Sequence, residues 1–171
     1  MAFTKRYIYA NMACELCVKD PNSHSFSALS PVNDIKVFYT APARALDRDH
    51  PEKLEFFRKH LVLARNKPWI WIFDCGEMAM QHYAPINFTL GLSKILEEEH
   101  GDVLQSILVI RPNWFTRCTL NILKAILPNK TLEKVVIIPE VNPMPALSTQ
   151  HGLSLKNITE LQEIFETPLP A

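Results

Sequence analysis

Residues 104–138 read LQSILVIRPNWFTRCTLNILKAILPNKTLEKVVII, and the order of patterns within this stretch decides the fold. Residues 104–110 are mostly apolar and have the length of a buried strand. A turn at Pro112 leads into an amphipathic segment over residues 113–126, and a second apolar run follows at 134–138. A strand, a helix and another strand in this order predict a crossover between two parallel strands of one sheet.

The same alternation of patterns continues along the rest of the chain. A short run at 68–73 (PWIWIF) is apolar on both faces, which is typical of a central strand. Other patterns predict strands at residues 6–9 and 34–40, and helices from Pro51, over 86–99 and from 157. The sequence therefore predicts one α/β domain over residues 1–171, with a mostly parallel sheet of about five strands and flanking helices.

Two segments lack a helical or strand period and are expected to be loops. Residues 11–31 are polar and are interrupted by turn-forming residues. Residues 139–152 (PEVNPMPALSTQHG) carry three prolines and are long for a connection within one domain. We therefore expect a Pro-rich loop insertion at 139–152.

Composition narrows the class of protein. Lysine plus arginine equals aspartate plus glutamate at 18 each, which predicts no general attraction to nucleic acid. The four glycines allow neither a GxGxxG nor a GxxxxGK[ST] motif, so most phosphate-binding loops are excluded. Because the N-terminus lacks a signal-peptide pattern and no apolar run reaches about 20 residues, we expect a cytoplasmic protein.

Charge is unevenly distributed within this neutral chain. Residues 77–102 hold five acidic residues and one lysine. Residues 111–132 hold no acidic residue and four basic ones, namely Arg111, Arg117, Lys124 and Lys130. These four are candidates for contact with a phosphoinositide head group, an anionic membrane or an acidic protein partner, at about 1 kcal/mol for each charge near an anionic surface. The alternative is an ordinary solvated helix face.

Three cysteines invite chemical interpretations. Cys14 and Cys17 form a CxxC pair, but structural zinc needs four ligands and only His24 lies near in sequence, so we predict incidental thiols and no metal. Cys75 follows a central strand, where α/β enzymes often carry a nucleophile, and His82 is available as a base. Because no orienting group or oxyanion element accompanies them, we predict that the protein is not an enzyme.

The motifs together resemble a known family. The strand at 68–73 ends in Asp74 with Gly76 close behind, PNWFTR follows the next strand, and Thr131 and Lys134 precede the last. In order and spacing these motifs resemble the CRAL-TRIO domain, a lipid-binding fold. The Pro-x-Trp-Phe-x-Arg run is similar to its BCH branch, which is associated with small-GTPase signalling. No counterpart of the N-terminal helical lobe found in many members is visible, and Arg111 stands where many members have asparagine.

The resemblance implies a CRAL-TRIO-like sandwich that acts as a non-enzymatic binding module, in the cytoplasm or peripherally at membranes. Its ligand would be hydrophobic or phospholipid-like, with no cofactor other than bound lipid, and the helix over 113–126 would be a gate above the cavity. The candidates for the pocket and the gate are Trp71, Phe73, Trp114, Phe115, Cys118, Ile122 and Ile126. The four basic residues would meet a head group or a partner.

Two alternatives stay open at this point. The helix over 113–126 has a periodicity that fits an ordinary crossover helix equally well. The function could instead be that of a BCH-type scaffold that docks a small GTPase or its regulator, with a hydrolase using Cys75 as a distant third.

Overall fold

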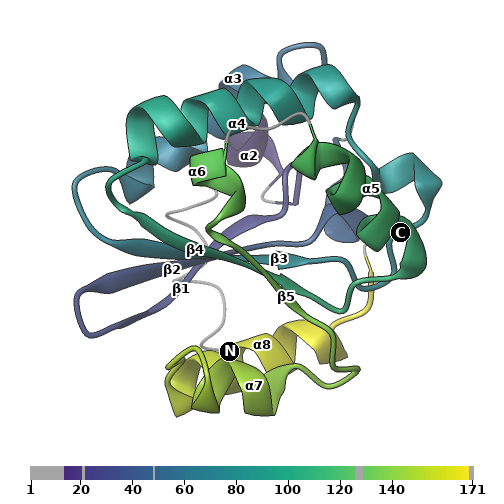
Figure 1. Cartoon of the computed structure of the whole chain (residues 1–171). Helices are drawn as coiled ribbons and strands as arrows, with labels where there is room; N and C mark the ends of the chain where they lie inside the picture. The colour runs from purple at the N-terminus through teal and green to yellow at the C-terminus, as the bar shows by residue number, and fades with distance from the viewer. Residues whose placement is uncertain (1–13, 21, 48, 126–128, 170–171) are drawn as a thin grey trace.

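The computed structural model describes residues 14–20, 22–47, 49–125 and 129–169, and its centre is a five-stranded sheet (Figure 1). The strands follow one another in the sheet in chain order. They are β1 Phe26–Val32, β2 Ile35–Thr40, β3 Trp69–Asp74, β4 Leu104–Ile110 and β5 Val135–Ile138. β1 pairs with β2 antiparallel, and all later pairings are parallel. The predicted α/β fold with a mostly parallel five-stranded sheet is therefore confirmed.

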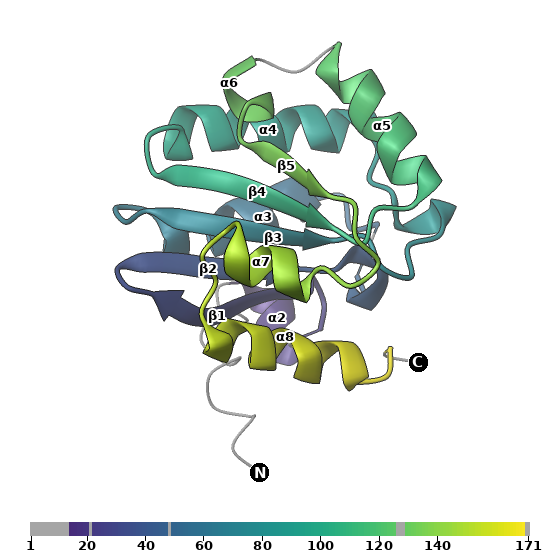
Figure 2. The same ribbon diagram turned by 60° about the horizontal axis from the view of Figure 1, so that its bottom comes forward.

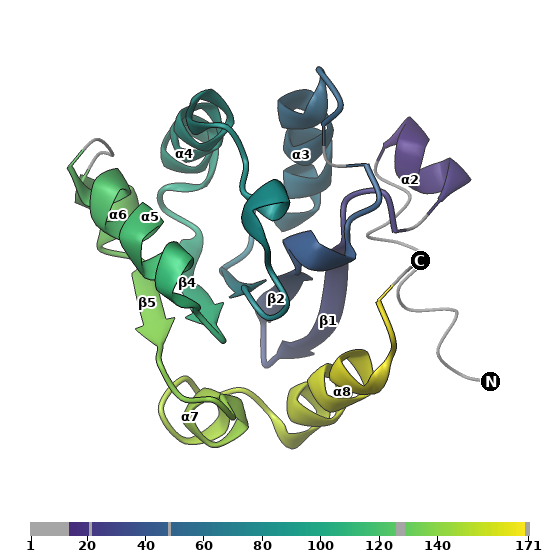
Figure 3. The same ribbon diagram turned by 90° about the vertical axis from the view of Figure 1, so that its right-hand side faces the viewer.

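Helices cover both faces of this sheet. They are α2 Glu15–Lys19, α3 Lys53–Leu61, α4 Ile86–His100, α5 Trp114–Lys124, α6 Asn129–Leu132, α7 Met144–Thr149 and α8 Leu155–Glu166. Figure 3 shows α3, α4, α5 and α6 on one side of the sheet and α7 and α8 on the other. Within the described part of the chain, no helix is long and apolar enough to cross a bilayer.

The central strand β3 supplies both apolar cores because its side chains alternate between the two faces. Trp69 and Trp71 pack into the core shared with α3 and α4. Ile70 and Ile72 pack into the core shared with α7 and α8. The Trp71 indole donates a hydrogen bond to Thr40 Oγ1 at 3.0 Å, so its buried N–H is satisfied.

Helix α8 lies beside the edge strand β1 (Figure 2), and polar side chains join the two elements. The Glu160 carboxylate accepts hydrogen bonds from the Ser30 backbone N–H at 2.8 Å and from its hydroxyl at 2.6 Å. The fully buried Asn157 donates to the Ser30 carbonyl at 2.6 Å. Ser154 caps α8 by accepting from the Asn157 backbone N–H.

Two predictions about loops are wrong. Residues 11–31, expected to be a loop, contain α2 and most of β1. The serines of β1 look like loop residues in sequence, yet Ser27 and Ser30 are buried, and Ser30 is bonded by α8. The strand expected at 6–9 lies outside the described residues.

The expected loop at 139–152 contains α7. Pro143 is its N-cap and Pro145 lies in its first turn. Proline is tolerated at these positions because the first backbone N–H groups of a helix have no intrahelical partner. Two of the three prolines that suggested a loop therefore mark the start of a helix.

Candidate functional site

A largely apolar cavity of about 210 Å³ lies between the sheet and the helices α3 to α6. Apolar cavities of about 150 Å³ bind benzene, whereas sites for drug-sized ligands occupy about 300–1,000 Å³. In this conformation the cavity therefore has room for a small apolar group or for part of a longer chain. Its lining includes Phe57, Trp71, Phe73, Phe88, Leu92, Leu96, Ile107, Val109, Thr116, Thr119, Leu120, Leu123, Thr131, Leu132 and Val135.

The start of helix α5 is held to the segment that follows β3. The Asn113 side chain caps the helix, accepting a hydrogen bond from the Thr116 backbone N–H at 2.8 Å. The Tyr83 hydroxyl donates to the same Asn113 oxygen at 2.8 Å, and the Asn113 amide donates to the Met78 carbonyl at 3.0 Å. Phe115 packs edge-on against Tyr83, with ring centroids 4.5 Å apart. These contacts give α5 a firm attachment at its N-terminal end.

The structure places only some of the predicted pocket residues at the cavity. Trp71 and Phe73 line it from β3. Four predicted gate residues of α5 are not among the lining residues, namely Trp114, Phe115, Cys118 and Ile122. Ile126 lies outside the described residues.

The face of α5 that lines the cavity consists of Thr116, Thr119, Leu120 and Leu123. The predicted gate residues thus lie roughly a quarter turn of the helix away from this face. The inward residues do have the i, i+3, i+4, i+7 spacing of a helix stripe, but two are threonines, which the predicted gate residues did not include. Treating threonine as a methyl-bearing side chain would have identified this face.

The outer face of α5 combines exposed apolar and basic side chains, and it comprises Trp114, Arg117, Ile122 and Lys124. Trp114 is 75% exposed and Ile122 is 59% exposed. Arg117 and Lys124 are exposed and form no ion pair with any residue that the structure describes. Lys130 is also exposed, on α6. Three of the four predicted basic residues are therefore available for contact with an anionic surface.

Arg111, the fourth predicted basic residue, is committed to an internal ion pair. Its guanidinium donates to the fully buried Asp74 carboxylate from Nε at 2.9 Å and from Nη2 at 2.5 Å. It also lies over the Phe165 ring at 3.9 Å. Burial alone lowers the pKa of Arg111, but the hydrogen bonds and charge of Asp74 outweigh this effect and raise the pKa. Arg111 therefore does not belong to the predicted head-group patch.

Asp74 organises the carboxyl end of β3. Besides Arg111, its carboxylate accepts hydrogen bonds from the Tyr39 hydroxyl at 2.5 Å and from the Gly76 backbone N–H at 2.8 Å. Burial and the neighbouring Asp74 charge raise the pKa of Tyr39 well above its usual value. A Cβ at Gly76 would overlap the Arg111 guanidinium, so the absence of a side chain there allows the ion pair to form.

Cys75 lines the cavity but is not activated. Its side chain is buried, and burial raises the pKa of its thiol to about 12. A cysteine nucleophile reacts as the thiolate, which this environment disfavours at neutral pH. The candidate base His82 accepts a hydrogen bond from the Ala79 backbone N–H at 2.8 Å through Nδ1. The arrangement offers no support for a hydrolase.

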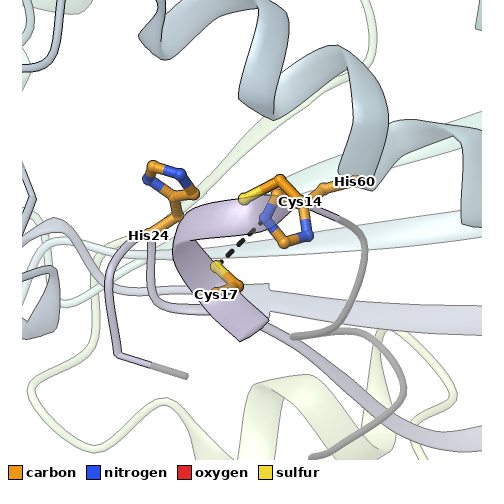
Figure 4. A group of neighbouring side chains, drawn as sticks. All are labelled: Cys14, Cys17, His24 and His60. Atoms are coloured by element: carbon orange, nitrogen blue, oxygen red, sulfur yellow. Dashed lines mark hydrogen bonds between the residues drawn. The ribbon is translucent and has the colours of Figure 1, made fainter. Parts of the chain in front are cut away.

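A second group of side chains comes together away from α5. Cys14, Cys17, His24 and His60 are all buried, and their donor atoms lie within 4.8 Å of one another (Figure 4). Burial lowers the pKa of His24 to about 4, so its ring is neutral at pH 7. Only His24 lies near the CxxC pair in sequence, but in the structure α3 also brings in His60, which is 43 positions from Cys17. The sequence contains no ligand spacing that would have indicated this.

The fold and the cavity define a class: an α/β domain with an apolar cavity between a sheet and the helices that cover it. A model of the CRAL/TRIO domain matches residues 52–151, which is more than half of the chain, and the chain belongs to this family. CRAL/TRIO domains generally bind lipophilic ligands, are mostly non-catalytic and are often peripheral at membranes.

Among solved structures, the crystal structure of Sfh5 is similar to this chain, with a TM-score of 0.55 and 12% sequence identity. The similarity covers 78% of this chain and 52% of that one, so this chain corresponds to about half of that structure. At this identity the likeness concerns the fold. No curated protein matches the sequence.

Proposed function

We propose that the chain binds a hydrophobic or phospholipid-like ligand in the cavity beneath α5. The observation that carries the proposal is a largely apolar cavity between the sheet and the helices α3 to α6, in a family that generally binds lipophilic ligands. Burial of hydrocarbon would supply about 0.8 kcal/mol per methylene. Because association costs about 4–15 kcal/mol, the ligand needs at least one acyl-length chain.

Helix α5 acts as the gate in this proposal. A cavity of about 210 Å³ is too small for a ligand of that length, so α5 must move away from the sheet for the ligand to enter. The contacts of Asn113 with Met78 and Tyr83 favour a movement that pivots at the N-terminal end of α5. The inward threonines support opening, because exposing a threonine side chain to water costs less free energy than exposing a leucine side chain.

The outer face of α5 suits exchange of the ligand at an anionic membrane. Trp114 and Ile122 would enter the boundary between head groups and acyl chains, as apolar residues of interfacial helices do. Arg117 and Lys124 would each contribute about 1 kcal/mol near anionic lipid. Docking through this face would put the gate itself at the membrane, where an extracted lipid enters without crossing water.

Native mass spectrometry and organic extraction of the purified chain test the ligand proposal. We expect a co-purified lipid, or uptake of lipid from vesicles. Leu123→Trp fills the cavity and should abolish uptake, whereas Ile122→Trp, one residue away on the outer face, should retain it. A chain that carries no lipid and takes none from vesicles would refute the proposal, as would equal uptake by the two variants.

A scaffold of BCH type is the second candidate, and the exposed Trp114 favours it. Tryptophan and arginine are enriched at the energetic centres of protein interfaces, and Trp114 and Arg117 both lie on the outer face of α5. The partner would be a small GTPase or its regulator. Under this proposal, Arg117→Glu with Lys124→Glu abolishes pull-down of the partner while lipid content is unchanged. Retained pull-down would exclude this face as the interface.

A further inference from the structure

The group formed by Cys14, Cys17, His24 and His60 connects three parts of the chain. Cys14 is the N-cap of α2, and Cys17 lies in that helix. His24 precedes β1, and His60 lies in α3. The four side chains are at most 3% exposed, and Cys17 Sγ lies 3.3 Å from His60 Nε2. Figure 4 shows the four side chains gathered around one space.

His24 supplies independent evidence that this group lacks a ligand. Both of its ring nitrogens are buried and have no hydrogen-bond partner within the described ranges. Leaving a buried polar group unpaired costs about 1–3 kcal/mol, so such groups are rare in folded proteins. Phe56 stacks on the ring at 5.4 Å, which holds the imidazole in place but satisfies neither nitrogen.

We propose that these four residues bind one structural zinc ion. Two thiolates and two imidazoles in tetrahedral arrangement are a ligand set that zinc prefers. With Zn–S near 2.3 Å and Zn–N near 2.0–2.1 Å, ligand atoms in a tetrahedron lie about 3.3–3.8 Å apart. The four donor atoms, all within 4.8 Å of one another, need a contraction of at most about 1.5 Å to reach this geometry.

The site is structural because it has four protein ligands and no open position. The ion would tie α2 and the segment before β1 to α3. A surface ion pair between Glu15 and Lys59, at 2.9 Å, already joins α2 to α3. His24 also lines the ligand cavity, so the ion would stabilise part of the cavity wall. Cys14, Cys17 and His24 lie outside the residues matched by the CRAL/TRIO model. The zinc site is therefore an addition to the family domain and does not depend on the proposed lipid function.

The metal content of the untagged full chain, expressed with added zinc and purified under reducing conditions, tests this proposal. We expect about one zinc per chain by elemental mass spectrometry. Cys14→Ser and His24→Phe should each weaken zinc binding by at least roughly 100-fold. Cys118→Ser and His151→Phe, which change the same residue types elsewhere, should bind zinc like the unaltered chain. Equal zinc content in Cys14→Ser and in Cys118→Ser would overturn the proposal.

A second measurement on the unaltered chain covers the case in which the variants do not fold. Replacing zinc by Co²⁺ should produce the intense visible absorption of tetrahedral, thiolate-bound cobalt, and added Zn²⁺ should remove it. A strong chelator should lower the Tm, and Zn²⁺ should restore it. A chain that takes up neither ion would refute the site. A Cys14–Cys17 disulfide in place of metal would instead assign the pair to redox chemistry.

Discussion

Replacing Arg111 by methionine removes the only charged partner that the described structure provides for the fully buried Asp74 carboxylate. Two neutral donors, the Tyr39 hydroxyl and the Gly76 N–H, would remain. Removing one partner of a buried ion pair costs about 3–5 kcal/mol. Because the Arg111 side chain is 22% exposed, water can reach part of the vacated space, and the lower end of this range applies.

In Arg111→Met, the loss of the contact with the Phe165 ring adds about 0.5–1 kcal/mol to the loss of stability. We therefore expect Arg111→Met to lower the free energy of unfolding by about 3–4 kcal/mol. For a chain of this size, that loss lowers Tm by about 10 °C. Urea unfolding followed by circular dichroism, together with a thermal melt, measures both quantities.

Two further variants make this reasoning refutable. Asp74→Asn combined with Arg111→Met leaves no unpaired charge and should recover a large part of the lost stability. Arg117→Met, on the exposed outer face of α5, should change stability by no more than about 0.5 kcal/mol. If Arg111→Met costs no more than Arg117→Met, or if Asp74→Asn does not rescue it, the ion pair does not stabilise the fold as argued.

Three other outcomes follow from the same structure. Burial lowers the pKa of His100, so as the pH falls the unfolded chain accepts a proton near pH 6.5 before the folded chain does. The free energy of unfolding should therefore decrease below that pH. The urea midpoints at pH 7.5 and pH 5.5 should differ less in His100→Phe than in the unaltered chain. Asn157→Ala removes the buried bond from α8 to Ser30 and should cost about 1–3 kcal/mol in urea unfolding; the same loss in exposed Asn121→Ala would contradict this. The buried Cys75, with its pKa raised to about 12, should resist alkylation by iodoacetamide at neutral pH, while the partly exposed Cys118 should react. Equal alkylation rates of the two cysteines, measured by mass spectrometry, would contradict this expectation.

The sequence predicted those features that depend on neighbouring residues along the chain. β4 has the bounds expected from its apolar run, and β3 is displaced by a single residue. The position of α5 followed from the turn at Pro112 and an amphipathic period, and the structure adds that Asn113 is its N-cap. These signals are local because backbone hydrogen bonding within a helix, and side-chain alternation along a strand, involve residues close in sequence.

The orientation of α5 about its own axis could not be predicted in the same way. The amphipathic period identifies a helix, but the face that turns inward depends on what packs against it. In this chain two threonines face the cavity while Trp114 and Ile122 face outward. A pattern that assumes inward apolar residues fails wherever large apolar side chains are exposed on a helix.

The sequence alone determined the strands β2 to β5 and the helices α3, α4, α5 and α8, because their periods depend on near neighbours, and their alternation predicted the mostly parallel sheet. It did not determine β1, α2 or α7, whose segments have the composition of loops. Only the tertiary structure decided which distant side chains meet. Arg111 was predicted to contact a head group because of its basic side chain, yet it pairs with Asp74, 37 positions away. Cys17 has the appearance of an incidental thiol, yet it meets His60 across 43 positions. Long-range contacts of this kind arise from the packing of whole elements against one another, and no local period encodes them.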